Sequence, residues 1–252
     1  MKIDFEGQAV LVTGASRGIG AAIARAFAAA NARVGLHCAA NRAAADALAD
    51  EIGGGAVVLQ AALDEPRNAA GLWAEAEQRL GRISALVNNA GVAVGSDPEG
   101  PLDDWLSDWS RTLNVNLVAA AVLCRAAVRH FRTHGGGRIV NIASRAAFRG
   151  DTPDYLAYAA SKGGLVSLTR SIARGYGREG ITAFVVAPGF TRTEMAQDFI
   201  DQYGEDYAMQ GAALAQMTRP EEVAPSVVFL ASGLADHATG ATLDINAGSY
   251  VH

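Results

Sequence analysis

The sequence has two cysteines, five scattered histidines and no long basic run, and each scarcity excludes a class of protein. Cys38 and Cys124 lack the spacing of metal ligands, so we expect two reduced, buried thiols in a cytoplasmic protein. His130 and His134 are expected on a solvated helix face, and we predict no metal site. The formal net charge of -5, without a basic patch, predicts that nucleic acid is not a partner.

The sequence also lacks the features of membrane and secreted chains. No run reaches the roughly 18 to 20 apolar residues that cross a bilayer, so we expect no membrane partner. Lys2 and Asp4 stand where a signal peptide would have its apolar stretch, so no signal peptide is expected. The 252 residues fit one large α/β domain or two small ones, and half of them are apolar, which is ample for a core.

Short β-rich runs alternate with longer alanine-rich helical runs along the chain. The expected strands are 8–14, 32–38, 56–61, 83–89, 138–144, 181–187 and 240–246. The expected helices are 18–31, 42–52, 68–81, 103–134, 155–178 and 220–232. This alternation predicts an α/β fold with one doubly wound parallel sheet of about seven strands and helices on both faces. The irregular segment 190–217, rich in Phe, Tyr and Met, is expected to be a substrate lid inserted at the edge of the sheet.

A glycine-rich turn, "TGASRGIG", follows the first expected strand. Gly14, Gly18 and Gly20 would let the backbone turn sharply and let a pyrophosphate approach the start of the next helix. The spacing is not the G-x-G-x-x-G of the most familiar dinucleotide fingerprint, and such a turn can also be a plain tight connection. Its place after the first strand of an alternating chain favours cofactor binding.

The end of the second strand indicates which dinucleotide would bind. An acid there would bind the adenosine ribose and repel a 2′-phosphate, but no acid lies in 34–41, and the critical place falls near Cys38. Arg17 in the glycine turn and Arg42 just past the strand suit a 2′-phosphate, so we predict that NADP(H) is favoured over NAD(H). The alternative is that both arginines are solvated surface charges.

Six motifs in order resemble those of the short-chain dehydrogenase/reductase family, and the resemblance covers essentially the full chain. They are "TGASRGIG" (13–20), "NNAG" (88–91), "NVNL" (114–117), "IAS" (142–144), "YAASK" (158–162) and "APG" (187–189). The resemblance implies a single Rossmann-type NAD(P)-binding domain over 1–252. It also implies a homotetramer formed through the helices 103–134 and 155–178.

The resemblance further implies a hydride transfer that interconverts a carbonyl and a secondary alcohol. Tyr158 would be the acid–base, and Lys162 would lower the phenol pKa and bind the nicotinamide ribose. Ser144 would hold the substrate oxygen, and Asn116, kinking its helix, would hold a water. Tyr158 follows Ser144 by fourteen residues, one more than the usual family spacing.

Cofactor contacts are implied at the glycine turn, at the ends of the next strands and in the loop after "APG". The residues are Gly14, Ser16, Arg17, Gly18, Ile19, Gly20, Cys38, Asn41, Arg42, Leu63, Asn88, Ala90, Gly91, Tyr158, Lys162, Pro188, Gly189, Thr191 and Thr193. The family's aspartate after the third strand is replaced by Ala62 or displaced to Asp64.

The substrate is left open by the sequence. The expected pocket wall offers Phe148, Tyr155, Phe190, Met195, Phe199, Tyr203, Tyr207 and Met209, with Arg145 and Arg149. An apolar or ring-shaped carbonyl compound would fit this wall, and an arginine could hold an acidic group. A 3-oxoacyl-carrier-protein reductase is one alternative. A non-catalytic dinucleotide sensor or scaffold is another.

Overall fold

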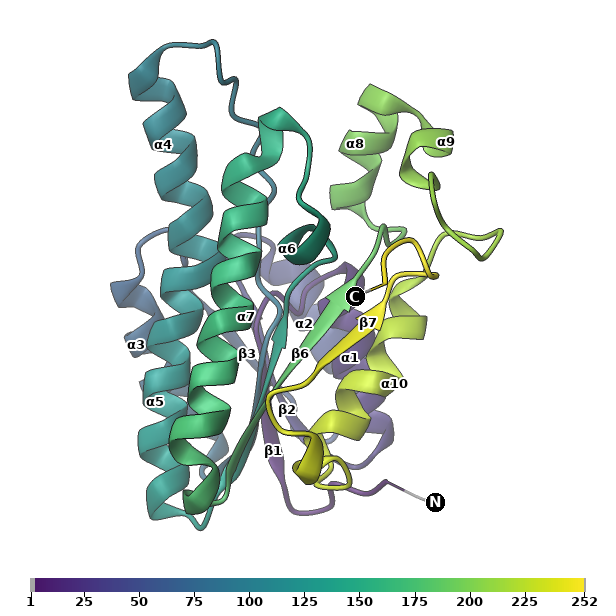
Figure 1. The fold of residues 1–252 in the computed structure, drawn as a ribbon. Helices are drawn as coiled ribbons and strands as arrows, with labels where there is room; N and C mark the ends of the chain where they lie inside the picture. The colour runs from purple at the N-terminus through teal and green to yellow at the C-terminus, as the bar shows by residue number, and fades with distance from the viewer. Residues whose placement is uncertain (1–2, 252) are drawn as a thin grey trace.

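The computed structural model describes residues 3–251, in which seven parallel strands form one central sheet (Figure 1). The strands are β1 (Ala9–Val12), β2 (Arg33–Cys38), β3 (Val57–Gln60), β4 (Ile83–Asn88), β5 (Gly137–Ile142), β6 (Ile181–Pro188) and β7 (Thr242–Ile245). Their order is β3-β2-β1-β4-β5-β6-β7, and every neighbouring pair is parallel. The predicted α/β fold class is confirmed.

The order of the strands places a ligand site. From β1 the chain builds β2 and β3 on one side and then returns to place β4 on the other. At such a reversal the two connections leave the sheet in opposite directions and open a crevice at the carboxyl ends of the strands. The glycine turn follows β1 and the "NNAG" segment follows β4, so both lie at this crevice.

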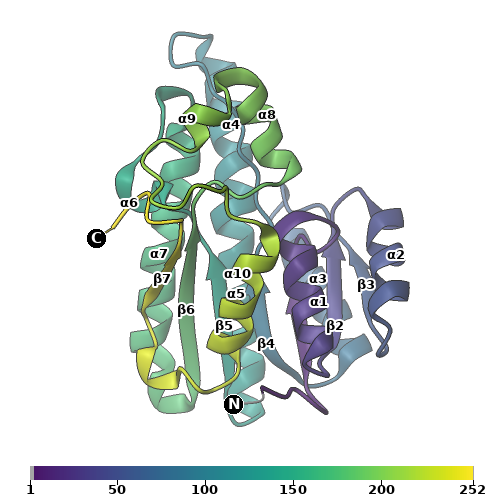
Figure 2. The same ribbon diagram turned by 90° about the vertical axis from the view of Figure 1, so that its right-hand side faces the viewer.

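Helices cover both faces of the sheet (Figures 1 and 2). One face carries α1 (Gly18–Ala29), α2 (Arg42–Ile52) and α10 (Pro220–Ala231), and the other carries α3 (Arg67–Leu80), α5 (Ala119–Thr133) and α7 (Leu156–Tyr176). Successive side chains of β1 alternate between the two cores: Val10 joins the first, and Leu11 joins the second. The strands are apolar on both faces because both faces are buried.

The expected helix 103–134 is interrupted in the structure. It consists of α4 (Leu102–Leu113), the π-helical turn η1 (Asn114–Val118) and α5. Contrary to the expectation from sequence, the run Leu102–Thr133 is long and apolar enough to cross a membrane by length and composition, with a window hydropathy of 1.3. Within that window, 44% is buried inside the protein.

The expected lid 190–217 holds two helices, α8 (Glu194–Tyr203) and α9 (Glu205–Ala208), which stand above the carboxyl-end edge of the sheet (Figures 1 and 2). The lid is held together by aromatic rings. The ring of Phe199 lies 4.7 Å from that of Phe190 and 4.6 Å from that of Tyr203, centroid to centroid. A short helix, α6 (Ala146–Arg149), connects β5 to the segment before α7.

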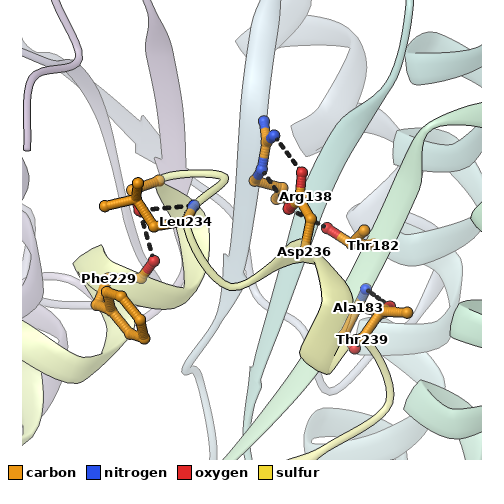
Figure 3. Close-up of polar contacts among 8 residues, drawn as sticks. Arg138, Thr182, Ala183, Phe229, Leu234, Asp236 and Thr239 are labelled. Carbon is orange, nitrogen blue, oxygen red and sulfur yellow. Dashed lines mark hydrogen bonds and ion pairs between the residues drawn. The ribbon is translucent and has the colours of Figure 1, made fainter.

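The opposite edge of the sheet is fixed by polar contacts (Figure 3). The carboxylate of Asp236 accepts two hydrogen bonds from Arg138, at 3.0 and 2.8 Å, and one from the Thr182 hydroxyl at 3.2 Å. The Thr239 hydroxyl accepts from the Ala183 N–H at 3.0 Å. These contacts tie the loop between α10 and β7 to β5 and β6, at the end of the sheet away from the crevice.

Two expectations about side chains are resolved by burial. Cys38 and Cys124 are free and buried, as predicted. His130, expected on a solvated face, is 5% exposed: its Nε2 accepts from the Ile83 N–H at 3.1 Å, and its Nδ1 lies 2.7 Å from the Glu77 carboxylate. The expectation is right for His134, which is exposed, and wrong for His130, because i, i+4 spacing alone does not reveal which side of a helix faces its neighbours.

Candidate active site

A cleft of about 750 Å³ opens at the carboxyl ends of the strands, between the glycine turn and the lid helix α8. Most of the residues predicted from the sequence line it. They are Gly14, Ser16, Arg17, Gly18, Ile19, Asn41, Leu63, Ala90, Gly91, Ser144, Tyr158, Lys162, Pro188, Gly189, Thr191 and Thr193. Ala62 and Asp64 also line the cleft, so both candidate positions after β3 reach it.

Five predicted residues are placed elsewhere: Gly20, Cys38, Arg42, Asn88 and Asn116 do not line the cleft. Cys38 is 1% exposed and packs in the core beneath β2. Arg42 starts α2, where its exposed guanidinium pairs with Asp46 at 3.4 Å. The two-arginine prediction is therefore corrected, because Arg17 lines the cleft and Arg42 does not.

The glycine turn has the backbone that the sequence predicted. Gly14 and Gly18 have φ of +63° and +53°, a left-handed conformation that side chains disfavour. Gly20 supports the turn from below, since a Cβ there would lie 2.1 Å from the Gly14 carbonyl oxygen. Thr193, the first residue before α8, reaches the turn: its methyl lies 3.2 Å from the place of a Gly18 Cβ. The turn leads directly into the start of α1, where free N–H groups would suit an anion such as a phosphate.

His37 holds the turn in place, and the sequence reading assigned it no role. Its Nδ1 accepts from the Gly14 N–H at 3.1 Å, so its protonated Nε2 donates to the Ala61 carbonyl at 2.9 Å. Burial lowers the pKa of His37, which keeps the ring neutral and both bonds intact at neutral pH. The residue joins the ends of β1, β2 and β3. The alternation of side chains along a strand could have indicated this role. His37 and Cys38 must point to opposite faces of the sheet, so they cannot have the same neighbours.

Asn89 is a second residue whose role was not predicted from the sequence. Its amide donates to the carbonyls of Thr13 at 2.9 Å and Gly14 at 3.0 Å. The Thr13 hydroxyl in turn accepts from the Asn89 and Ala90 N–H groups, at 2.9 and 3.0 Å. Asn88, which was predicted at the cofactor, instead donates to Asn141 at 2.8 Å inside the sheet. The two asparagines therefore have different roles. Asn88 connects two strands of the sheet, and Asn89 stabilises the glycine turn.

The inner end of the cleft brings together Ser144, Tyr158 and Lys162, as the resemblance implied. Ser144 lies just past β5, and its hydroxyl is hydrogen bonded to that of Tyr158. Lys162 is one turn further along α7, and its Nζ donates to the Ile142 carbonyl at 2.9 Å. The Nζ lies 5.7 Å from the centroid of the Tyr158 ring.

Burial controls the ionisation of this pair. Burial raises the pKa of Tyr158 to about 12, and the bond to Ser144 acts in the opposite direction. Burial also lowers the pKa of Lys162 to about 8. The expected lowering of the phenol pKa is not found in the protein alone, because desolvation outweighs the stabilising contacts.

Asn116 lies behind the pair, in the π-helical turn that interrupts the long helix. Its Oδ1 accepts from the Val92 N–H at 2.8 Å, and its Nδ2 donates to the Val92 carbonyl at 2.9 Å and to the Ser161 hydroxyl at 3.0 Å. The extra residue of a π turn lets the side chain reach both partners. Asn116 thus joins the loop after β4 to α7, the helix that carries Tyr158 and Lys162.

The cleft has room for an extended dinucleotide because glycines line its floor. A Cβ on Gly14 would lie 2.9 Å from the Ala90 Cα, and one on Gly91 would lie 3.3 Å from the Lys162 Nζ. The glycine turn, Tyr158 and Lys162 line this same cleft, so together they would hold such a cofactor. A bound nicotinamide would supply or accept the hydride there.

We expect Lys162→Met to abolish turnover and to change the pH dependence of stability. The ammonium has a folded-state pKa of about 8 against an ordinary 10.5, so its burial penalty is fully present below pH 8. The penalty fades as pH rises from 8 towards 10.5, because the folded state there binds fewer protons than the unfolded state. As pH rises from 8 towards 10.5, the free energy of unfolding should therefore increase more for the wild type than for the variant.

Urea unfolding of both proteins through that pH window measures the effect. Both proteins contain Tyr158, so its titration contributes equally to their free energies of unfolding and does not affect the difference between them. A difference that stays constant with pH would contradict the assigned burial of the Lys162 charge.

Comparisons with known proteins agree with this arrangement. The family described as Enoyl-(Acyl carrier protein) reductase matches residues 14–250. The 3-oxoacyl-[acyl-carrier-protein] reductase FabG of Escherichia coli is 34% identical over 249 residues, which cover 99% of this chain and 100% of that protein. D-threitol dehydrogenase of Mycolicibacterium smegmatis is 35% identical over 255 residues, with 98% of this chain and 96% of that protein covered.

A solved structure shows the same architecture. The 3-oxoacyl (acyl-carrier-protein) reductase from Agrobacterium tumefaciens, solved with NADP bound, has a TM-score of 0.88 and 30% identity. The match covers 97% of this chain and 95% of that one.

Proposed function

Because this chain belongs to the short-chain dehydrogenase/reductase family, and is therefore an NAD(P)-dependent oxidoreductase acting on alcohol or carbonyl groups, we propose that it interconverts a carbonyl and a secondary alcohol with Tyr158 as the acid–base. The observation that carries the proposal is the meeting of Ser144, Tyr158 and Lys162 at the inner end of a cleft that begins at a glycine turn. Together with Asn116, which lies behind them, these side chains come from three parts of the fold: the turn η1, the end of β5 and α7.

Each side chain has a defined task in reduction. The Ser144 hydroxyl holds the carbonyl oxygen, and the Tyr158 phenol, hydrogen bonded to Ser144, gives that oxygen its proton. Lys162, whose Nζ lies 5.7 Å from the centroid of the Tyr158 ring, places a positive charge near the phenolate that forms when the proton leaves. Burial raises the pKa of Tyr158 to about 12, so the phenol carries its proton at neutral pH and is present as the acid that reduction requires.

An assay of NADPH oxidation with a panel of ketones, aldehydes and quinones tests the function. We expect at least one compound to be reduced by the wild type. A protein that binds NADPH tightly, yet reduces no carbonyl in the panel or on a carrier protein, would instead be a sensor or scaffold.

A 3-oxoacyl-carrier-protein reductase is the second candidate, favoured by the 34% identity to FabG over the full chain. It predicts that a 3-oxoacyl group on the carrier protein is reduced faster than any free ketone. The acidic net charge of -5 argues against it, since an acidic carrier needs a basic docking surface.

We propose NADP(H) as the favoured cofactor. Past β2 the cleft is lined by Ala39, Ala40 and Asn41, none of which is acidic, while Arg17 lines it from the glycine turn. The Arg17 guanidinium pairs with Glu194 at the start of α8, and both side chains are largely exposed. A 2′-phosphate would compete with Glu194 for this guanidinium.

We expect Arg17→Ala to raise KM for NADPH by roughly 10- to 100-fold, the worth of a hydrogen bond to a charged group, with little change for NADH. Glu194→Gln should lower KM for NADPH, because it removes the competing carboxylate. Initial rates with both cofactors measure these effects, and Arg42→Ala is the matched control. A wild type that prefers NADH would contradict the proposal.

We propose a homotetramer built through α4 and α7. Leu102 and Leu106 on α4 are 67% and 47% exposed, and Leu156 on α7 is 46% exposed, so both helices present apolar side chains to solvent. Light scattering of the purified protein would give its assembly state. We further propose a cytoplasmic location, which suits two free thiols.

A further inference from the structure

The residue after Ser144 is a buried arginine that faces the cleft. Arg145 is 6% exposed and lines the cleft, and its guanidinium carbon lies 4.9 Å from the centroid of the Phe190 ring. Its backbone N–H donates to the Pro188 carbonyl at 2.9 Å, which fixes its position beside the loop after β6. A charged group is rarely buried so deeply without a partner.

No such partner of Arg145 is found among the described residues. Among the ion pairs of the part of the chain that the structure describes, none includes Arg145. Its charged neighbours are Arg149, which repels it, and Asp151, which attracts it from beyond ion-pair distance; the Tyr207 phenol also acts on it. Burial lowers the pKa of Arg145 to about 10, so it still carries its charge at neutral pH.

Other arginines at the same end of the molecule behave differently. Arg17 and Arg192 have exposed side chains, and each pairs with a carboxylate of the lid, Glu194 and Glu205 respectively. Of the arginines that line the cleft in the described chain, Arg145 is the buried one. Burying a cation without a counter-ion costs stability. The Arg145 guanidinium would therefore be stabilised by an anion that binds in the cleft.

We infer that Arg145 binds a carboxylate on the substrate, so that the enzyme acts on oxo acids and the corresponding hydroxy acids. The inference rests on the proposed function. Arg145 follows in sequence the serine that holds the reacting oxygen, and its guanidinium lies against Phe190, at the start of the lid segment. One fixed guanidinium matches one carboxylate through two parallel hydrogen bonds.

The chemistry at the carbonyl is unchanged by this contact. The oxo carbon gains a hydride from NAD(P)H, its oxygen gains the Tyr158 proton, and the carboxylate keeps its charge throughout. Arg145 is therefore a specificity-determining residue that orients the substrate and takes no part in proton transfer.

The test compares oxo acids with their methyl esters. The probes are a series in which the chain between the oxo group and the carboxylate lengthens by one methylene at a time. We expect the wild type to reduce at least one acid with a kcat/KM about 10- to 100-fold above that of its ester, as for a hydrogen bond to a charged group. Arg145→Met should erase this preference, mainly through KM, while ester reduction continues; Arg145→Lys should restore part of it.

Arg178→Met, at an exposed site outside the cleft, is the matched control and should keep the full preference. A wild type that prefers the esters, or an Arg145→Met variant that keeps the preference for the acid, would overturn the inference. If the protein reduces no carbonyl at all, the proposed function fails, and binding decides the role of Arg145 separately. In that case the hydroxy acids should raise Tm of the NADPH-loaded wild type but not of Arg145→Met; equal shifts would overturn the inference.

Folding of the variant is checked with NADPH alone. Because the buried charge lacks an internal partner, Arg145→Met should bind NADPH as the wild type does and should unfold at an equal or higher Tm. A markedly lower Tm would show that Arg145 has a structural partner and would overturn the inference.

Discussion

Tyr158→Phe should lower kcat/KM for carbonyl reduction by about 100- to 10,000-fold, the contribution expected of a positioned general acid. The substitution removes the phenolic hydroxyl that gives its proton to the substrate oxygen while leaving the ring in place on α7. Lys162, with its Nζ bonded to the Ile142 carbonyl, should stay where it is. NADPH should therefore bind to the variant nearly as it binds to the wild type.

Steady-state rates and NADPH titration of the same samples separate the two effects. Tyr176→Phe, at the other end of α7 and outside the cleft, is the matched control and should keep full activity. A Tyr158→Phe variant with wild-type activity would end the assignment of the acid–base. Loss of NADPH binding together with activity would instead make Tyr158 a binding residue.

Gly20→Ala should abolish cofactor binding and destabilise the fold. The new Cβ would lie 2.1 Å from the Gly14 carbonyl oxygen and 2.5 Å from the Asn89 amide nitrogen. The Gly14 main chain cannot rotate away from the new Cβ as a flexible side chain could. Either the turn or the start of α1 must therefore shift. Overpacking of this kind costs about 1 to 3 kcal/mol or more, and any shift displaces the N–H groups that face the phosphates.

Thermal unfolding and NADPH titration measure both parts of this prediction. Gly71→Ala is the matched control, since nothing lies within 4 Å of a Cβ added there, in the exposed part of α3. We expect that control to stabilise the protein slightly, because alanine favours a helix over glycine by up to about 1 kcal/mol. A Gly20→Ala variant that binds NADPH normally would contradict the described packing of the turn.

Much of the fold and of the catalytic centre could be predicted from the sequence, because both depend on local signals. Alternating apolar runs predicted the seven strands, and the expected helix 42–52 coincides with α2. The meeting of Ser144, Tyr158 and Lys162 was implied by the resemblance of six ordered motifs to those of the family.

The rest could not be predicted because it depends on contacts between distant segments. Cys38 points into the core while His37 reaches the glycine turn, a choice set by the register of β2 against its neighbours. The pair of Arg17 and Glu194 joins residues that the sequence separates widely. The burial of Arg145 depends on Phe190, from the loop after β6.

The most direct test of the proposed hydride transfer traces deuterium from the cofactor to the product. Wild-type protein is incubated with a reducible carbonyl compound and NADPH that carries deuterium at the transferred position of nicotinamide C4, and the product is analysed by mass spectrometry. The account predicts an alcohol with one deuterium on its carbinol carbon, formed by the wild type and not by Tyr158→Phe. Alcohol without deuterium at that carbon, or equal labelled product from both proteins, would contradict it.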